Sequence, residues 1–206
     1  GLGDVYKRQV LPRELAAGEP LPEKPVLITF DDGYRSNYDL AYPLLQKYQT
    51  KAAIAVMAYM QDNPGGNFLT WDMCREMTAS GLVEIGSHGY AIHNLDGRMG
   101  NFVPGQANGV QRRKGESGSD FYCRVLDDLR YSFDRIAQET GAPPTFFAYP
   151  FGKTDPDADA YLEGLFPLTV VTGPGKYAAN LSKGLHQLPR FTVTMERSLA
   201  ALLKNT

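Results

Sequence analysis

Residues 25–34 read PVLITFDDGY and join a short apolar run to a pair of carboxylates. The run at residues 26–30 is rich in β-branched and aromatic side chains, which is typical of a buried strand. Asp31 and Asp32 end this strand, where neighbouring side chains point to different sides. One carboxylate would then bind a cation while the other serves as a base. The alternative is a helix N-cap followed by a first-turn acid, because aspartate suits both positions.

Outward from this stretch, strand-like and helix-like segments alternate along the chain. Further strands are expected at residues 51–57, 82–85, 144–149, 168–172 and 188–194, and helices at residues 36–48, 71–80, 120–140, 157–165 and 198–203. This alternation predicts a parallel sheet, and reactive residues at several strand ends are typical of a barrel with its site at the C-terminal face. The absence of GxGxxG and GxxxxGK[ST] motifs disfavours the nucleotide-binding members of this class.

The composition excludes several other classes of protein. The chain has 206 residues, 43% apolar and 21% charged, which suits one globular domain with a sizeable core. A net charge of −2 and a pI near 5.9 disfavour binding to nucleic acid by bulk electrostatics. No apolar run approaches the roughly 20 residues that a transmembrane helix needs. Cys74 and Cys123 are interpreted as small core residues, with a single bridge between them left open.

Two of the three histidines bracket a short segment that directly follows an expected strand. His88 and His93 come after residues 82–85, and neutral imidazole is a common ligand for zinc-like metals. With one carboxylate they form a set that leaves positions open for water and substrate. The alternative is a pair of hydrogen-bonded loop histidines. The third, His186, is interpreted as a surface loop residue in preference to a general acid.

The start of the chain and one long polar segment are set apart from this pattern. Residues 1–10 read GLGDVYKRQV, which lacks an initiator Met and an apolar leader. These ten residues resemble translated adapter sequence, and we expect residues 1–19 to be a lead-in, in part non-native, and residues 20–206 to form one domain. Residues 1–25 hold four prolines and no β-branched run, which predicts no strand. Residues 94–118 are polar and glycine-rich, which predicts a mobile loop beside the substrate groove.

Three motifs together resemble the polysaccharide deacetylases, the carbohydrate esterases of family four with a nodulation-type deacetylase domain. They are residues 29–33 (TFDDG), the loop from Ser87-His88 to His93, and residues 149–152 (YPFG), in this order and at fitting intervals. Residues 25–34 and the phrase FAYPFG are most similar to the poly-N-acetylglucosamine deacetylase branch. The resemblance implies that residues 20–206 form a polysaccharide deacetylase domain with a distorted (β/α)7 barrel. Its first strand, and the acid histidine of this branch, would lie upstream of this chain.

The resemblance also assigns the metal centre and the base. It implies that Asp31 is the catalytic base. It further implies that one divalent metal, with Zn²⁺ preferred, is held by Asp32, His88 and His93. Gly89 occupies a slot where the family usually has Ser or Thr, so we expect the loop to lose a bracing hydroxyl.

The third motif and the strand at residues 188–194 supply the remaining implied roles. The backbone N–H near Phe151 would donate to the oxyanion. Ala148 stands where the family usually has Arg, so Arg190 would orient Asp31 instead. Substrate contacts are expected from Tyr90, Tyr149 and Pro150.

The implied reaction is hydrolysis of an N-acetyl group on a glucosamine residue of a polysaccharide. Three alternatives stay open: an esterase for O-acetylated sugars with the same site, a truncated non-catalytic carbohydrate-binding relative, and a barrel glycosidase. The last would use Asp31 as its acid and needs a second carboxylate about 5–9.5 Å away. The expected partner is the polysaccharide, with no nucleic acid and no transmembrane segment. The family resemblance suggests a secreted or cell-surface location.

Overall fold

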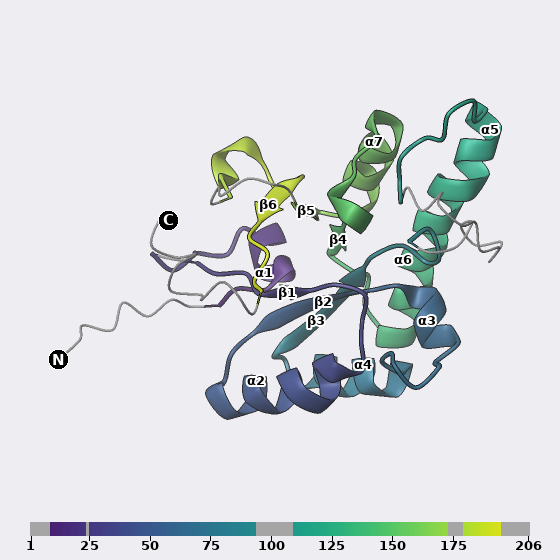
Figure 1. The fold of residues 1–206 in the computed structure, drawn as a ribbon. Helices are drawn as coiled ribbons and strands as arrows, with labels where there is room; N and C mark the ends of the chain where they lie inside the picture. Colours follow the sequence, from purple (N-terminus) through teal and green to yellow (C-terminus); the bar gives the residue numbers. More distant parts are fainter. Residues whose placement is uncertain (1–8, 24, 94–108, 173–178, 195–206) are drawn as a thin grey trace.

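The computed structural model describes residues 9–23, 25–93, 109–172 and 179–194, and it contains a curled sheet of six parallel strands (Figure 1). The strands are β1 (Thr29–Phe30), β2 (Ala52–Val56), β3 (Val83–Ser87), β4 (Phe146–Ala148), β5 (Leu168–Thr172) and β6 (Leu188–Arg190). They lie in chain order, and every neighbouring pair is parallel. This half-barrel confirms the expected α/β barrel class.

Helices follow most of the strands. They are α1 (Pro12–Ala16), α2 (Tyr42–Tyr48), α3 (Ala58–Asp62), α4 (Trp71–Ala79), α5 (Gly118–Phe121), α6 (Asp127–Thr140) and α7 (Pro156–Leu165). π-Helical turns precede α2 at Asn37–Ala41 and join α5 to α6 at Tyr122–Leu126. The helices expected around α2, α4, α6 and α7 are confirmed. The Thr70 hydroxyl caps α4 by accepting from the Met73 N–H at 3.3 Å, and Gly141 ends α6 with φ 79°.

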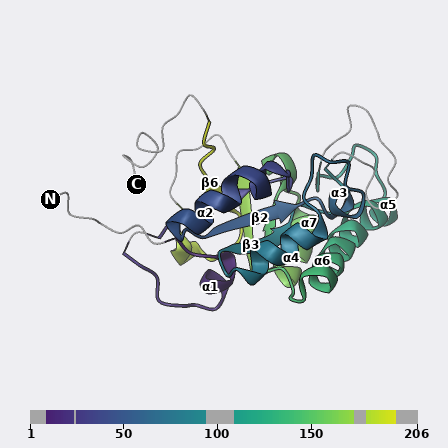
Figure 2. The same cartoon turned by 90° about the horizontal axis from the view of Figure 1, so that it is seen from below.

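Alternate residues of the strands face two different layers. Ala52, Ile54 and Val56 of β2 pack outward against α2, α4 and α6, which lie in a row over this face of the sheet (Figure 2). Ala53 and Ala55 of the same strand point inward, into a core shared with residues of β4, β5 and β6. The period of two along each strand therefore builds both the outer layer and the interior of the half-barrel.

A glycine on β3 lets a phenylalanine from the next strand fill the interior. A Cβ atom at Gly86 would lie only 2.2 Å from the Phe146 ring. Phe146 is fully buried in the inner core. The missing side chain at Gly86 therefore makes room for the Phe146 ring between β3 and β4, whose carboxyl ends lead to His88 and Tyr149.

The segment around α1, which the sequence pattern set apart as a lead-in, packs against the sheet. Gln9 forms a single isolated parallel bridge with Val26 and belongs to no strand. Leu15 is buried in the inner core. The Arg13 N–H donates to the Glu84 carboxylate on β3 at 3.0 Å. The short helix α1 thus covers the barrel at the amino-terminal ends of the strands. Its apolar residues are too widely spaced in the sequence to resemble a strand.

The last predicted strand is shorter than expected. β6 ends at Arg190, where its partner β5 also ends at Thr172. Residues 191–194 are largely exposed and pair with no strand of the part of the chain that the structure describes, so the prediction of a strand to residue 194 is wrong. The helix expected at residues 198–203 lies outside the described part of the chain.

Half of the expected mobile loop is firmly held. Residues 94–108 lie outside the described part of the chain, but residues 109–117 are anchored to the helix that follows them. The buried Arg124 guanidinium donates to the Gly109 carbonyl oxygen at 3.2 Å and pairs with the buried carboxylate of Glu116. Val110 of the same segment is fully buried in the hydrophobic core. The prediction of a loosely packed segment is therefore wrong for residues 109–117, which a buried ion pair and a buried apolar side chain both anchor.

The cysteines and the helices bear on two further expectations. Cys74 is buried as expected, whereas Cys123 is exposed, and both are free thiols. The core assignment of Cys123 is wrong because its π-helical turn directs it outward. Within the described residues, no helix is long and apolar enough to cross a membrane.

Candidate metal centre and catalytic cleft

The chain turns sharply at the carboxyl end of β1, where the two aspartates lie. Asp32 and Gly33 both adopt left-handed backbone conformations, with φ of 70° and 71°. Aspartate enters this region more readily than most residues. At Gly33 a Cβ atom would lie 2.8 Å from the Val56 side chain. The turn gives the carboxylates of Asp31 and Asp32 different partners.

His88 is fixed in orientation by the end of β4. Its ring is buried, and its Nδ1 atom lies 2.7 Å from the carbonyl oxygen of Ala148. A carbonyl oxygen can only accept a hydrogen bond, so the proton of the neutral ring is on Nδ1. The lone pair of Nε2 then points to the same space as the carboxylate of Asp32. Burial holds the pKa of His88 below its ordinary value, although the charges of Asp31 and Asp32 oppose this effect. The ring is therefore neutral, as metal ligation requires.

Three side chains converge on one point. The Asp32 Oδ1 atom lies 3.4 Å from the Nε2 atom of His88 and 3.7 Å from that of His93. One potential ligand atom from each residue lies within 4.8 Å of the others. Asp32 Oδ1 is buried and has no hydrogen-bond partner among the described residues, which is costly for a carboxylate oxygen. A divalent cation would satisfy it, so these residues fit a metal site of the two-histidine, one-carboxylate kind.

Asp31 pairs with Arg190 on β6. The two terminal guanidinium nitrogens donate to the two carboxylate oxygens, each at 2.7 Å. The same guanidinium donates to the hydroxyls of Thr29 and Thr172 at 3.0 and 2.9 Å, so β1 and β5 both hold it in place. Burial would raise the pKa of Asp31, but the hydrogen bonds and charge of Arg190 hold it below its ordinary value. Asp31 is therefore an ionised, oriented carboxylate at neutral pH.

The loop between the two histidines is held by α6. Asp128 is fully buried, and its two oxygens accept from the N–H groups of Tyr90 and Ala91, each at 2.8 Å. Burial raises the pKa of Asp128 to about 7, against the lowering effect of these backbone donors. One turn further along α6, the Ser132 hydroxyl lies 2.7 Å from that of Ser87. The sequence analysis did not identify Asp128 and Ser132 as supports of this loop. Their only signal in the sequence is that two polar residues are spaced i, i+4 on a buried face of the helix.

Gly89 tightens the loop, which corrects the expectation that it loosens it. Its φ is 85°, and a Cβ atom there would lie 2.6 Å from the Ile92 side chain. The Gly89 N–H donates to the Ser87 hydroxyl at 3.0 Å. Ser87 therefore supplies the bracing hydroxyl from a different position.

Phe151 forms one wall of a cavity of about 250 Å³ at this centre. The cavity is lined by Asp31, Asp32, His88, His93, Tyr149, Phe151, Gly152 and Thr172. Phe151 has φ 60°, which is rare for a bulky residue, and its ring centroid lies 4.4 Å from that of His93. At Gly152 a Cβ atom would meet the Thr172 carbonyl oxygen at 1.9 Å. Backbone strain of this kind is concentrated at functional sites.

Two of the residues predicted to contact substrate, Tyr90 and Pro150, do not line this cavity. The Tyr90 ring packs in the outer core, edge-on to Tyr131, so it offers no face to a sugar. Pro150 is buried and does not line the cavity. Tyr149 does line it, with its hydroxyl donating to Asp159 at 2.9 Å. Tyr90 and Pro150 are close in sequence to residues of the site, which is why they were predicted to contact substrate. The backbone turn after His88 directs the Tyr90 side chain into the core instead.

His186 lies towards the opposite end of the sheet. It comes four residues before Arg190, and its neighbour Leu185 accepts from the Thr169 N–H near the start of β5. His186 is half-buried and lies before β6, where Gln187 has φ 54°, so the chain between His186 and Arg190 is not fully extended.

The sequence profile of the polysaccharide deacetylases matches residues 18–165. The chain belongs to this family. Polysaccharide deacetylases are metal-dependent, and the cluster of Asp32, His88 and His93 is a possible metal site of such a protein. Membership in this family also removes the glycosidase alternative.

Known polysaccharide deacetylases resemble the chain in sequence and in fold. The poly-β-1,6-N-acetyl-D-glucosamine N-deacetylase of Escherichia coli is 29% identical over 156 residues, which cover 67% of this chain and 23% of that protein. This chain thus matches about a quarter of the length of that relative. The deacetylase domain from Bordetella bronchiseptica is 28% identical, with a TM-score of 0.69 over 92% of this chain and 86% of that one. A de-N-acetylase from Aggregatibacter actinomycetemcomitans is 26% identical, with a TM-score of 0.79 over 99% and 84%.

Proposed function

We propose that this chain removes N-acetyl groups from a β-1,6-linked N-acetylglucosamine polysaccharide in a metal-dependent hydrolysis. One observation carries the proposal: Asp31, which Arg190 orients, lines the same cavity of about 250 Å³ as the cluster of Asp32, His88 and His93. The substrate class is that printed in the name of the E. coli relative.

We assign the metal as Zn²⁺, held by Asp32, His88 and His93. This donor set of one carboxylate oxygen and two imidazole nitrogens leaves positions open, as catalytic zinc sites do. When bound, the metal would polarise the acetyl carbonyl and lower the pKa of a water molecule to about 7. His88 is suited to ligation because the Ala148 carbonyl fixes its Nδ1 proton and leaves Nε2 free to bind.

Asp31 acts as the base. Its carboxylate takes a proton as the water oxygen forms a bond to the acetyl carbon. The N–H of Phe151 donates to the oxyanion that develops on the carbonyl oxygen, a contact of the kind worth about 3 kcal/mol. The carbon–nitrogen bond then breaks, and the proton held by Asp31 passes to the leaving nitrogen. Acetate and a glucosamine amine are the products, and Arg190 keeps the carboxylate oriented throughout.

Acetate release from two polymers tests this function. Zinc-loaded protein should release acetate from poly-β-1,6-N-acetylglucosamine and generate free amines, and it should act poorly on acetylated xylan. Asp31→Asn should reduce the rate by about 10² or more, the usual contribution of a general base. Asp134→Asn is the matched control, because Asp134 is exposed and pairs only with Arg130 on α6. Acetate from xylan alone would establish the O-acetyl esterase alternative, and no acetate from either polymer would establish the non-catalytic one.

A further inference from the structure

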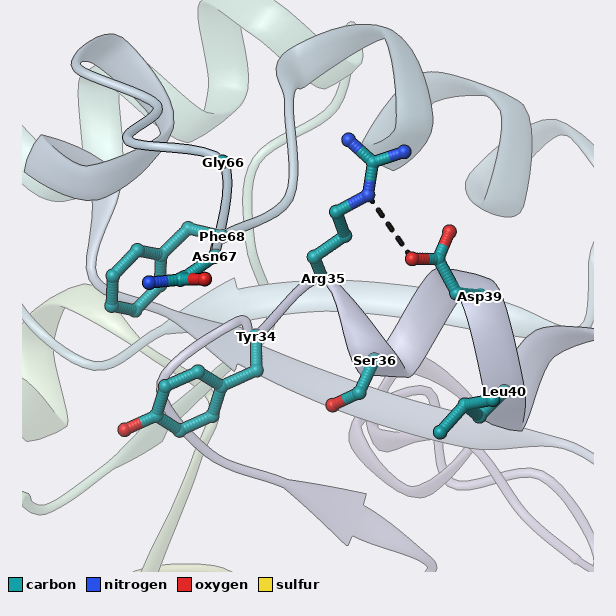
Figure 3. Close-up of a pocket in the computed structure, with 8 residues that line it drawn as sticks. All are labelled: Tyr34, Arg35, Ser36, Asp39, Leu40, Gly66, Asn67 and Phe68. Atoms are coloured by element: carbon teal, nitrogen blue, oxygen red, sulfur yellow. Dashed lines mark hydrogen bonds and ion pairs between the residues drawn. The ribbon is translucent and has the colours of Figure 1, made fainter.

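A second hollow of about 560 Å³ lies beside the π-helical turn that precedes α2 (Figure 3). It is lined by Tyr34, Arg35, Ser36, Asp39, Leu40, Gly66, Asn67 and Phe68. Tyr34 follows Asp32 by only two residues, so the Cα atoms of these two residues lie at most about 7 Å apart. We refer to this hollow as the aromatic groove.

The backbone of the aromatic groove is pinned by a short antiparallel pairing. Tyr34 and Phe68 form an isolated bridge. The Arg35 N–H donates to the Asn67 carbonyl at 2.8 Å, and the Leu69 N–H donates to the Gly33 carbonyl at 2.9 Å. The same turn that aims Asp32 at the histidines therefore also sets the position of the groove.

The two rings of the groove stack on each other, so that Phe68 supports the Tyr34 ring. The Tyr34 and Phe68 rings stack with their centroids 5.1 Å apart and their planes 18° apart. Tyr34 is nevertheless 46% exposed, so part of its ring remains open to solvent. Figure 3 shows these rings at one end of the groove and Asp39 and Leu40 at the other. The exposed part of this ring combines an apolar surface with a polar hydroxyl group.

Polar groups face the same space. Arg35 pairs with Asp39 at 3.0 Å, and both side chains are nearly half exposed, which leaves further donor and acceptor capacity. The Ser36 hydroxyl and the Asn67 amide also line the groove. A flat apolar surface ringed by hydroxyl, amide and charged groups matches a pyranose ring, whose C–H face is apolar and whose edge carries hydroxyl and amide groups.

We propose that the aromatic groove binds an N-acetylglucosamine residue of the same polysaccharide chain, next to the residue that is deacetylated. This inference rests on the proposed function for the identity of the polymer. The sugar stacks on the open part of the Tyr34 ring, and its polar edge bonds to the Arg35–Asp39 end. The protein therefore favours oligomers over a single sugar, because only an oligomer reaches both the cavity at the metal centre and the groove.

Calorimetric titration with β-1,6-linked N-acetylglucosamine, as monomer and as pentamer, tests the groove without relying on turnover. The zinc-loaded Asp31→Asn chain serves as the non-hydrolysing parent. Adding Tyr34→Ala should weaken pentamer binding by about tenfold, equivalent to 1.4 kcal/mol, and leave monomer binding unchanged. Tyr34→Phe should bind like the parent. Tyr48→Ala is the matched control, since Tyr48 is 65% exposed on α2 and does not line the groove.

Two results would overturn the proposal. One is equal pentamer affinity in Tyr34→Ala and Tyr48→Ala. The other is an equal loss for monomer and pentamer in Tyr34→Ala, which would mean that the ring only stabilises the turn at Asp32. The binding series is read separately from acetate release, so a failure of the proposed activity and a failure of the groove are distinguishable.

Discussion

Replacing Asp128 by asparagine should loosen the metal centre without touching any of its proposed ligands. The carboxylate of Asp128 accepts from the N–H groups of Tyr90 and Ala91 through separate oxygens, each at 2.8 Å. An asparagine of the same shape keeps one acceptor and turns an NH₂ donor towards the other N–H. One buried backbone N–H then loses its partner, at a cost of about 1–3 kcal/mol.

This cost should appear in the affinity for zinc. His93 follows Ala91 by two residues, so the loop that Asp128 holds is the loop that positions His93. If the loop must be ordered when zinc binds, the free energy of binding becomes less favourable by this roughly 1–3 kcal/mol. That change corresponds to a fall of about 5–150-fold in zinc affinity. Losses of about 10–100-fold are usual for groups that support metal ligands from behind.

Competition with a chromogenic chelator at pH 8 would measure the zinc affinity, and urea unfolding would measure stability. At that pH the Asp128 carboxyl, with its pKa of about 7, is mostly ionised. Asp134→Asn on the same helix is exposed and should change either quantity by less than about 0.5 kcal/mol. Unchanged zinc affinity in Asp128→Asn, with or without a loss of stability, would refute the positioning role.

Three further outcomes follow from other parts of the molecule. Arg190→Gln should retain zinc but lower kcat/KM by about 10–10²-fold, because Asp31 loses its bidentate partner; equal rates with and without Arg190 would contradict this. Gly86→Ala should destabilise the protein by about 1–3 kcal/mol in urea unfolding, since its Cβ atom would overlap the Phe146 ring. Burial raises the pKa of Glu84, so the wild type should lose stability relative to Glu84→Gln as pH rises above about 4.3, the unfolded value; parallel stability curves would disprove it.

The sequence predicted the strand ends well because local patterns determine them. The β-branched run before Asp31 and the apolar run before His88 each specify a strand, and parallel strands bring their carboxyl ends to one edge. Helix boundaries at Thr70 and Gly141 were predictable for the same reason, because capping is a local matter.

The supports of the site could not be predicted, because they come from distant segments. Asp128 lies about 40 residues from the loop that it holds, and nothing near His88 in the sequence points to it. Tyr90 was misassigned because proximity in sequence to His88 does not fix which way a loop side chain turns. The packing of Leu15 into the barrel interior was missed because a five-residue helix carries too few positions for a periodic pattern.

Metal content measured together with acetate release tests the central claim most directly. Wild type and Asp31→Asn should each carry one zinc per chain, and Asp32→Asn should carry none. Only the wild type should release acetate from poly-β-1,6-N-acetylglucosamine. Loss of zinc in Asp31→Asn, or its full retention in Asp32→Asn, would contradict the division of roles between the two aspartates and with it the proposed mechanism.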